Sequence, residues 1–129
     1  MKIALIAQND KKELITQLCI AYCGILAKHT LCSTATTGRV IADATGLDIE
    51  FVLPGVTGGA EQIASRIAYG EIDLLLYFRD SSDEFDSEDA EMIQLCDTYN
   101  VPLATNLATA EALILALDRG DLDWRNNLH

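Results

Sequence analysis

The chain has 129 residues and a mass of 14.1 kDa, the usual size of one domain built around one core. Half of the residues are apolar and 22% are charged, which excludes an intrinsically disordered chain. Nine Lys and Arg against 20 Asp and Glu give a formal charge of -11, which works against nucleic acid or an anionic membrane as partner. A small phosphorylated ligand remains possible, because backbone amides and one or two cations can hold it whatever the net charge.

The sequence predicts neither a membrane span nor a signal peptide. No apolar run reaches the roughly 18 residues of a membrane span, and the first eight residues lack the cleavage site of a signal peptide. We therefore expect a soluble, cytoplasmic protein. No CxxC pair is present, and we expect four buried, reduced thiols at Cys19, Cys23, Cys32 and Cys96.

The predicted elements alternate between strand and helix along the chain. Apolar runs and helical periodicity predict, in order, a strand at 2–8, a helix at 11–28, a strand at 31–33, a helix at 39–45 and a strand at 49–53. The second half predicts a helix at 60–69, a strand at 73–78, a helix at 87–100, a strand at 101–105 and a helix at 109–118. Such alternation predicts one α/β domain over residues 1–129, with a parallel sheet between helices and right-handed crossovers.

Ligands of such sheets bind at the carboxyl ends of the strands, so the residues that follow each strand are the candidates for a site. The segment STATTG after the second strand is the best of them. Thr34, Thr36 and Thr37 offer hydroxyls, Gly38 permits close backbone approach, and a helix opening at Arg39 offers free amides to a phosphate. An ordinary helix cap explains the same residues, and PGVTGG after the third strand is either a second ligand loop or a packing turn.

Six segments in order and spacing resemble the methylglyoxal synthase family: KIALIAQND, ATTG, ATGL, PGVTGGAEQ, YFRD and VPLATNLATAE. The resemblance covers almost the whole chain. It implies a three-layer α/β/α fold with a five-stranded parallel sheet, a homohexamer, no cofactor, and conversion of dihydroxyacetone phosphate to methylglyoxal and phosphate. Domains of carbamoyl phosphate synthetase and IMP cyclohydrolase share this fold, so fold alone does not settle function.

The phosphate-binding half of the family pattern is present. Lys12, the three threonines and Gly55 match it, and Arg125 in the tail aligns loosely with an arginine that reaches the phosphate. The resemblance implies that a neighbouring subunit supplies this arginine. The resemblance and the strand-end rule together predict these ligand-binding residues: Gln8, Asn9, Lys12, Thr34, Thr36, Thr37, Gly38, Gly55, Gly58, Gly59, Asn106 and Arg125.

The catalytic half of the pattern is altered. The family removes a proton from the substrate with an aspartate, and that position is Ala60 here. Neutral Gln8 and Asn9 replace a histidine and an aspartate, and Phe85 falls near the position of a second histidine. Asp80 persists, and Glu88 falls near a second family aspartate. The acidic run from 80 to 91 lacks the ligand spacing of a metal site.

Two functions are compatible with these residues. The first, which we favour from the sequence, is a binding module without synthase activity that holds a phosphorylated metabolite or nucleotide as sensor, regulator or sequestering protein. The alternative is an active synthase, a carbon–oxygen lyase, that relies on Asp80 and Glu88. The loss of a catalytic carboxylate commonly lowers the rate by about a thousandfold, which favours the binding module.

Overall fold

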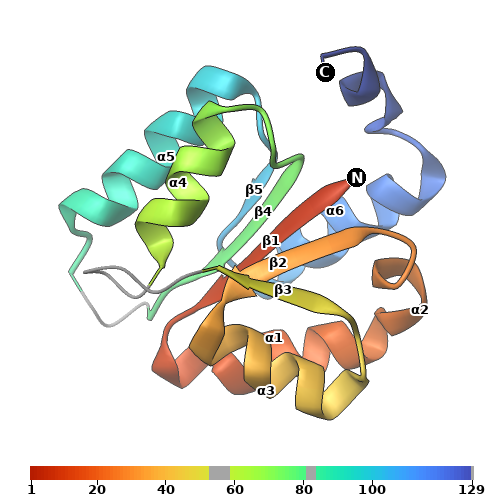
Figure 1. Cartoon of the computed structure of the whole chain (residues 1–129). Coiled ribbons are helices and arrows are strands. Elements are labelled where there is room, and N and C mark those ends of the chain that lie inside the picture. The colour runs from red at the N-terminus through yellow and green to blue at the C-terminus, as the bar shows by residue number, and fades with distance from the viewer. Residues whose placement is uncertain (53–58, 81–83, 129) are drawn as a thin grey trace.

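A parallel sheet runs through the centre of the computed structural model, which describes residues 1–52, 59–80 and 84–128 (Figure 1). Over these residues the strands are β1 (Lys2–Ala7), β2 (Thr30–Thr34), β3 (Ile49–Val52), β4 (Leu74–Phe78) and β5 (Leu103–Ala104). Their order in the sheet is β3-β2-β1-β4-β5, and each pair is parallel. All five carboxyl ends therefore lie along one edge of the sheet.

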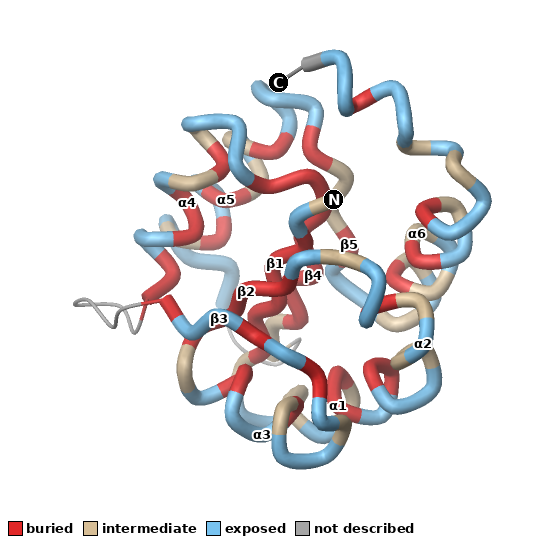
Figure 2. Tube along the Cα trace, turned by 45° about the vertical axis from the view of Figure 1, so that its right-hand side comes forward, coloured by how far each residue is buried: buried red, intermediate tan, exposed pale blue. Residues whose placement is uncertain are grey.

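Helices cover both faces of the sheet, so the predicted three-layer α/β/α fold is confirmed. One layer contains α1 (Lys12–Ala21), α2 (Cys23–Leu26), α3 (Ala35–Thr45) and α6 (Leu107–Arg119), and the other contains α4 (Ala60–Ala68) and α5 (Ser87–Tyr99). Alternate residues of the central strand β1 serve the two cores, because successive side chains of a strand point to opposite faces. Ile3 and Leu5 pack under α1 and α3, whereas Ala4 and Ile6 pack under α4. Figure 2 shows β1 as a largely buried strand in the middle of the molecule.

Two helix boundaries differ from the prediction. The helix expected over 11–28 is preceded by a 3₁₀ turn, η1 (Asn9–Lys11), and is interrupted at Tyr22, whose backbone (φ −111°, ψ 23°) leaves the helical region. The break lets α2 turn Leu26 fully into the core. The helix expected from Arg39 begins at Ala35, because Thr34 ends β2 in an extended conformation that serves directly as the N-cap.

The strand β5 is shorter than predicted, with two residues, since it lies at the edge of the sheet and pairs only with β4 among the described strands. The chain ends in a second 3₁₀ turn, η2 (Asp123–Leu128). All four cysteines are free, and three are buried, whereas Cys23 is only half-buried at the start of the short α2. Within the described residues, no helix is long and apolar enough to cross a bilayer.

Candidate functional site

Three of the predicted ligand-binding residues meet at the end of β1. Lys12 Nζ donates a hydrogen bond to the Ala7 carbonyl at 2.6 Å. Thr37 Oγ1 lies 3.2 Å from both the carbonyl and the N–H of Ala7, and accepts a hydrogen bond from Thr34 Oγ1 at 3.2 Å. The two buried hydroxyls thus fasten β2 and α3 to the end of β1. Lys12 is half-buried where it contacts Ala7, and this burial lowers the pKa of its ammonium group.

The first turn of α3 carries the remaining polar groups of the STATTG segment. Thr36 is exposed there, and no side chain caps the helix through Thr34. The amides of this turn have no helical partner and carry the positive end of the helix dipole, which favours an anion. Lys12 and Thr36 therefore flank a helix terminus suited to a phosphate group.

Gly38 has a packing role in place of the ligand approach expected from the sequence. A Cβ at this position would lie 2.7 Å from the ring of Phe51 and 3.1 Å from Cβ of Ser33. The absence of a side chain lets α3 lie close against β2 and β3. Gly59 has a backbone role as well, since its left-handed conformation (φ 108°) turns the chain into α4.

A cavity of about 350 Å³ opens where β1 and β4 end, and it is lined by Gln8, Asn9, Asp10 and Asp80. The Gln8 side chain accepts a hydrogen bond from the Asp80 N–H at 2.5 Å, and the Gln8 N–H donates to the carbonyl of Phe78 at 2.9 Å. These bonds hold Asp80 beside the end of β1. Desolvation, followed by the charge of Asp80 and a hydrogen bond with it, raises the pKa of Asp10.

A second cavity of about 350 Å³ lies between the first turns of α4 and α5, which run side by side (Figure 1). Ala60, 3% exposed, and Glu88 both line it. The pKa of Glu88 is raised by burial and then by the negative charges of Asp86, Asp89 and Glu61. The structure therefore places a carboxyl group with a raised pKa at the cavity that contains the alanine.

Asn106 lies at the end of β5 but has a structural contact. Its Oδ1 accepts a hydrogen bond from the Thr109 N–H at 3.0 Å and so caps α6. Gly55 and Gly58 lie outside the described residues. Among those that are described, no group of three or more His, Cys, Asp or Glu residues is arranged to hold a metal ion.

Arg125 does not join the other predicted ligand-binding residues in this chain. Its Nε lies 3.4 Å from Asp73 Oδ1, both side chains are almost fully buried, and its Nη1 donates to the carbonyl of Asn100. Asp73 and Asn100 precede β4 and β5, so this cluster lies at the amino edge of the sheet. The length of β4, roughly 17 Å, separates it from the carboxyl edge. The ion pair with Asp73 thus holds the Arg125 guanidinium away from the carboxyl edge of its own chain, and its supply to the phosphate of a neighbouring subunit stays a prediction.

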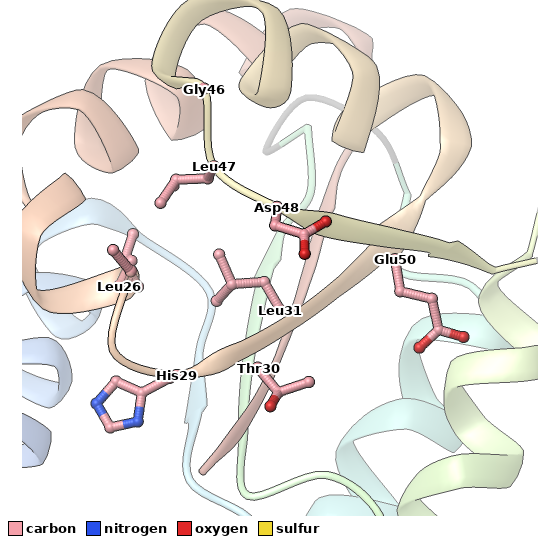
Figure 3. A pocket seen from close by; sticks show the side chains of 9 residues that line it. Leu26, His29, Thr30, Leu31, Gly46, Leu47, Asp48 and Glu50 are labelled. Atoms are coloured by element: carbon pink, nitrogen blue, oxygen red, sulfur yellow. The ribbon is translucent and has the colours of Figure 1, made fainter.

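The amino edge also has a cavity, of about 470 Å³, between α2, β2 and β3 (Figure 3). Leu26, Leu31 and Leu47 form its apolar part, and the His29 ring lies at its rim. His29 Nδ1 lies 3.1 Å from the N-terminal ammonium group of Met1, and burial and that charge lower the pKa of the imidazole.

Sequence reasoning missed two buried polar residues near Glu88. Tyr77 and Asp89 are 2% and 1% exposed, and their side chains form a hydrogen bond of 2.8 Å. Asp89 belongs to the acidic run from 80 to 91, a composition typical of a solvent-exposed segment, and Tyr77 belongs to an apolar strand. Neither context indicates a buried polar pair. The one available signal was the Asp86–Asp89 spacing of a reciprocal helix cap.

Comparisons with known proteins agree on one family. A family model described as MGS-like domain matches residues 18–105. A methylglyoxal synthase of Caldicellulosiruptor saccharolyticus is 54% identical over 97% of this chain and 90% of its own length, and one of Geobacillus thermodenitrificans is 46% identical over 100% and 91%. The crystal structure of methylglyoxal synthase from Elizabethkingia anophelis superposes with a TM-score of 0.80 at 35% identity, covering 88% of this chain and 76% of that one.

These relatives correct the function favoured from the sequence. We expected a binding module without synthase activity because Ala60, Gln8 and Asn9 replace catalytic residues. Proteins that share about half their residues with nearly all of this chain are named synthases, and they favour the alternative, an active enzyme. The family model, the relatives and the shared fold agree that this chain belongs to the methylglyoxal synthase-like domain family.

Proposed function

We propose that this chain is a methylglyoxal synthase, a lyase that converts dihydroxyacetone phosphate to methylglyoxal and inorganic phosphate. The observation that carries the proposal is the position of Glu88. Its carboxyl group lines the same cavity as Ala60, the position where the family has its proton-abstracting aspartate. A glutamate from α5 supplies a base where the residue on α4 cannot.

The phosphate group of the substrate fits the first turn of α3. Lys12 contributes a positive charge at the end of β1, and Thr36 contributes an exposed hydroxyl. Unpartnered amides of a helix N-terminus bind phosphate oxygens even in a chain with a net charge of -11. These groups hold the leaving group while the rest of the substrate extends toward the ends of β1 and β4.

Glu88 takes the proton in this proposal. Its carboxylate removes a proton from the hydroxyl-bearing carbon of the substrate, and the resulting enediol expels phosphate as the carbon–oxygen bond breaks. The raised pKa of Glu88 makes its carboxylate a stronger base than that of an ordinary glutamate. The enol that remains tautomerises to methylglyoxal, and the proton on Glu88 passes to the released phosphate through water, so all atoms balance and the carboxylate is restored.

Gln8 and Asp80 orient the substrate. Because the Gln8 Oε1 accepts the Asp80 N–H, the Gln8 Nε2 group is left as a hydrogen-bond donor that can polarise the substrate carbonyl. Asp80, beside Asp10 in the first cavity, can accept a hydrogen bond from a substrate hydroxyl. This chain therefore uses an amide where its family uses a histidine.

The test is a direct assay of both products from dihydroxyacetone phosphate, with methylglyoxal and phosphate measured in equal amounts. Glu88→Gln should lower kcat by about 100- to 10,000-fold, because proton transfer by a positioned base contributes that much. Glu111→Gln on α6 removes the same charge in the opposite helical layer and serves as the matched control. A parent protein that releases neither product would refute the proposal, and an unaffected Glu88→Gln variant would refute the role of Glu88.

Self-association is a separate proposal. Among the described residues, five exposed aromatic side chains are available for subunit contacts: Phe51, Tyr69, Phe85, Tyr99 and Trp124. They support self-association, and the family pattern makes a homohexamer the specific form that we propose. Light scattering at micromolar concentration tests this, and a monomer would contradict it.

A further inference from the structure

A buried polar network connects the end of β4 to the first turn of α5. Tyr77 Oη donates a hydrogen bond of 2.8 Å to Asp89 Oδ1, and Arg79 Nε donates one of 3.1 Å to Asp89 Oδ2. The Arg79 guanidinium also lies over the ring of Phe85, 5.5 Å from its centroid. Asp89 thus links Tyr77 in β4 and Arg79 just after β4 to the start of α5.

The same aspartate closes the helix cap. Asp89 Oδ2 accepts a hydrogen bond from the Asp86 N–H at 3.2 Å, and Asp86 Oδ1 accepts one from the Asp89 N–H at 2.9 Å. This reciprocal pair satisfies two backbone groups at the start of α5. The first turn of α5 is therefore fixed both to its own N-terminus and to the sheet.

Glu88 lies between the two capping residues in that turn. Its side chain lines the cavity with Ala60. The residue that follows it, Asp89, is fixed by the Tyr77 hydroxyl and by the Asp86 N–H. This arrangement makes the position of Glu88 depend on Tyr77 and Asp89.

We propose that Tyr77 and Asp89 are positioning residues that hold the Glu88 side chain at the cavity beside Ala60. The catalytic consequence rests on the proposed function, since it takes Glu88 as the base. The structural consequence does not, because the orientation and titration of Glu88 can be measured without substrate.

The two residues should act on Glu88 with opposite signs. The groups that face Glu88 are Asp86 and Asp89 from its own segment, Glu61 from α4 and Tyr77 from β4, and Glu91 lines the same cavity. The three aspartate and glutamate neighbours raise the pKa of Glu88, as does burial, whereas the Tyr77 hydroxyl lowers it. Removing the hydroxyl should raise this pKa further. Neutralising Asp89 should lower it.

The experiment is an NMR titration of the protein labelled with ¹³C at glutamate side-chain carboxyls, with the Glu88 signal assigned by its loss in Glu88→Gln. We expect Tyr77→Phe to raise the pKa of Glu88 and Asp89→Asn to lower it, each by about half a unit or more. Asp97→Asn, an exposed change on the same helix, is the matched control and should leave the titration unchanged. Shifts in the same direction, or below about 0.3 unit in both variants, would overturn the inference.

Asp89→Asn leaves Arg79 without its buried carboxylate partner and can unfold the chain. Tyr77→Phe keeps the ion pair between Arg79 and Asp89. The titration of Glu88 in this variant therefore tests the inference if Asp89→Asn does not fold. If the parent is active, the pH profile of kcat/KM should shift with the Glu88 titration in each variant, and a fixed profile would overturn the catalytic part. If the parent is inactive, the proposed function fails while the titration still decides whether Tyr77 and Asp89 control Glu88.

Discussion

Replacing Arg125 with methionine separates the role seen in the structure from the one suggested by the family pattern. Methionine keeps much of the length of the side chain but removes its charge and donors. The change leaves Asp73 buried, with a side chain only 7% exposed, and deprives the Asn100 carbonyl of its donor. Breaking a buried ion pair in this way costs about 3–5 kcal/mol, because an uncompensated charge remains.

The lower part of that range applies here, since Asp73 Oδ2 still accepts a hydrogen bond from the Lys2 N–H at 2.9 Å. We expect Arg125→Met to lose about 3 kcal/mol in urea unfolding followed by circular dichroism, and to lower Tm by roughly 10–15 °C. Protein concentration must be the same for both chains, because subunit association would change the apparent stability.

A second variant checks the cause of this loss. Adding Asp73→Asn to Arg125→Met removes the stranded charge and should recover much of the stability. The KM for dihydroxyacetone phosphate should change little in either variant that stays folded, because the ion pair lies at the opposite edge of the sheet from Lys12. Unchanged stability together with a large increase in KM would refute the structural role and restore Arg125 to the phosphate.

Three further predictions follow from single contacts. Inorganic phosphate should raise the Tm of the parent by several degrees, and Thr36→Ala should abolish that rise. Thr98→Ala on α5 is the control and should preserve the rise. Equal stabilisation of both variants by phosphate would count against the α3 anion site. Asn106→Ala should lose about 1 kcal/mol of unfolding free energy and Asn106→Asp far less, since the cap of α6 depends on the side-chain oxygen; equal losses would exclude the cap. The pKa of Glu88 is raised in the folded chain, so its favourable contribution is present below the unfolded pKa and is lost as pH rises through the folded one. Glu88→Gln should therefore unfold at a higher temperature than the parent at pH 8, with a difference that shrinks toward pH 4, and a constant difference would contradict this.

Local sequence patterns were sufficient for most of the fold. A run of apolar residues without Gly or Pro predicts a strand that is buried on both faces of a sheet. The structure shows such strands at β1 and β4. Gly46 ended a predicted helix, and the structure shows it in the left-handed conformation that glycine favours. Boundaries failed where a neighbour decided them, as at Thr34, which turns β2 directly into α3.

The candidate site was predicted only to the level of its edge. The strand-end rule placed the threonines at the carboxyl edge, and the family pattern drew attention to Lys12 and Ala60. Neither indicated that the Thr34 and Thr37 hydroxyls form a hydrogen bond with each other and that Thr37 also binds Ala7. Neither indicated that the missing side chain at Gly38 leaves space for the ring of Phe51. Those contacts join residues of different elements, and residue spacing along one element carries no information about them.

The sequence by itself determined the alternation of elements and the parallel sheet, and it predicted the edge of the candidate site, because hydrophobic periodicity and turn residues act over a few neighbouring positions. Only the tertiary structure decided which side chains meet. It paired Arg125 with Asp73, 52 residues away, and it brought Glu88 of α5 to the cavity that contains Ala60 of α4. Such meetings depend on how helices pack across the sheet, and burial then changes the energetics of the groups concerned: the charge of Arg125 becomes structural, and the pKa of Glu88 rises.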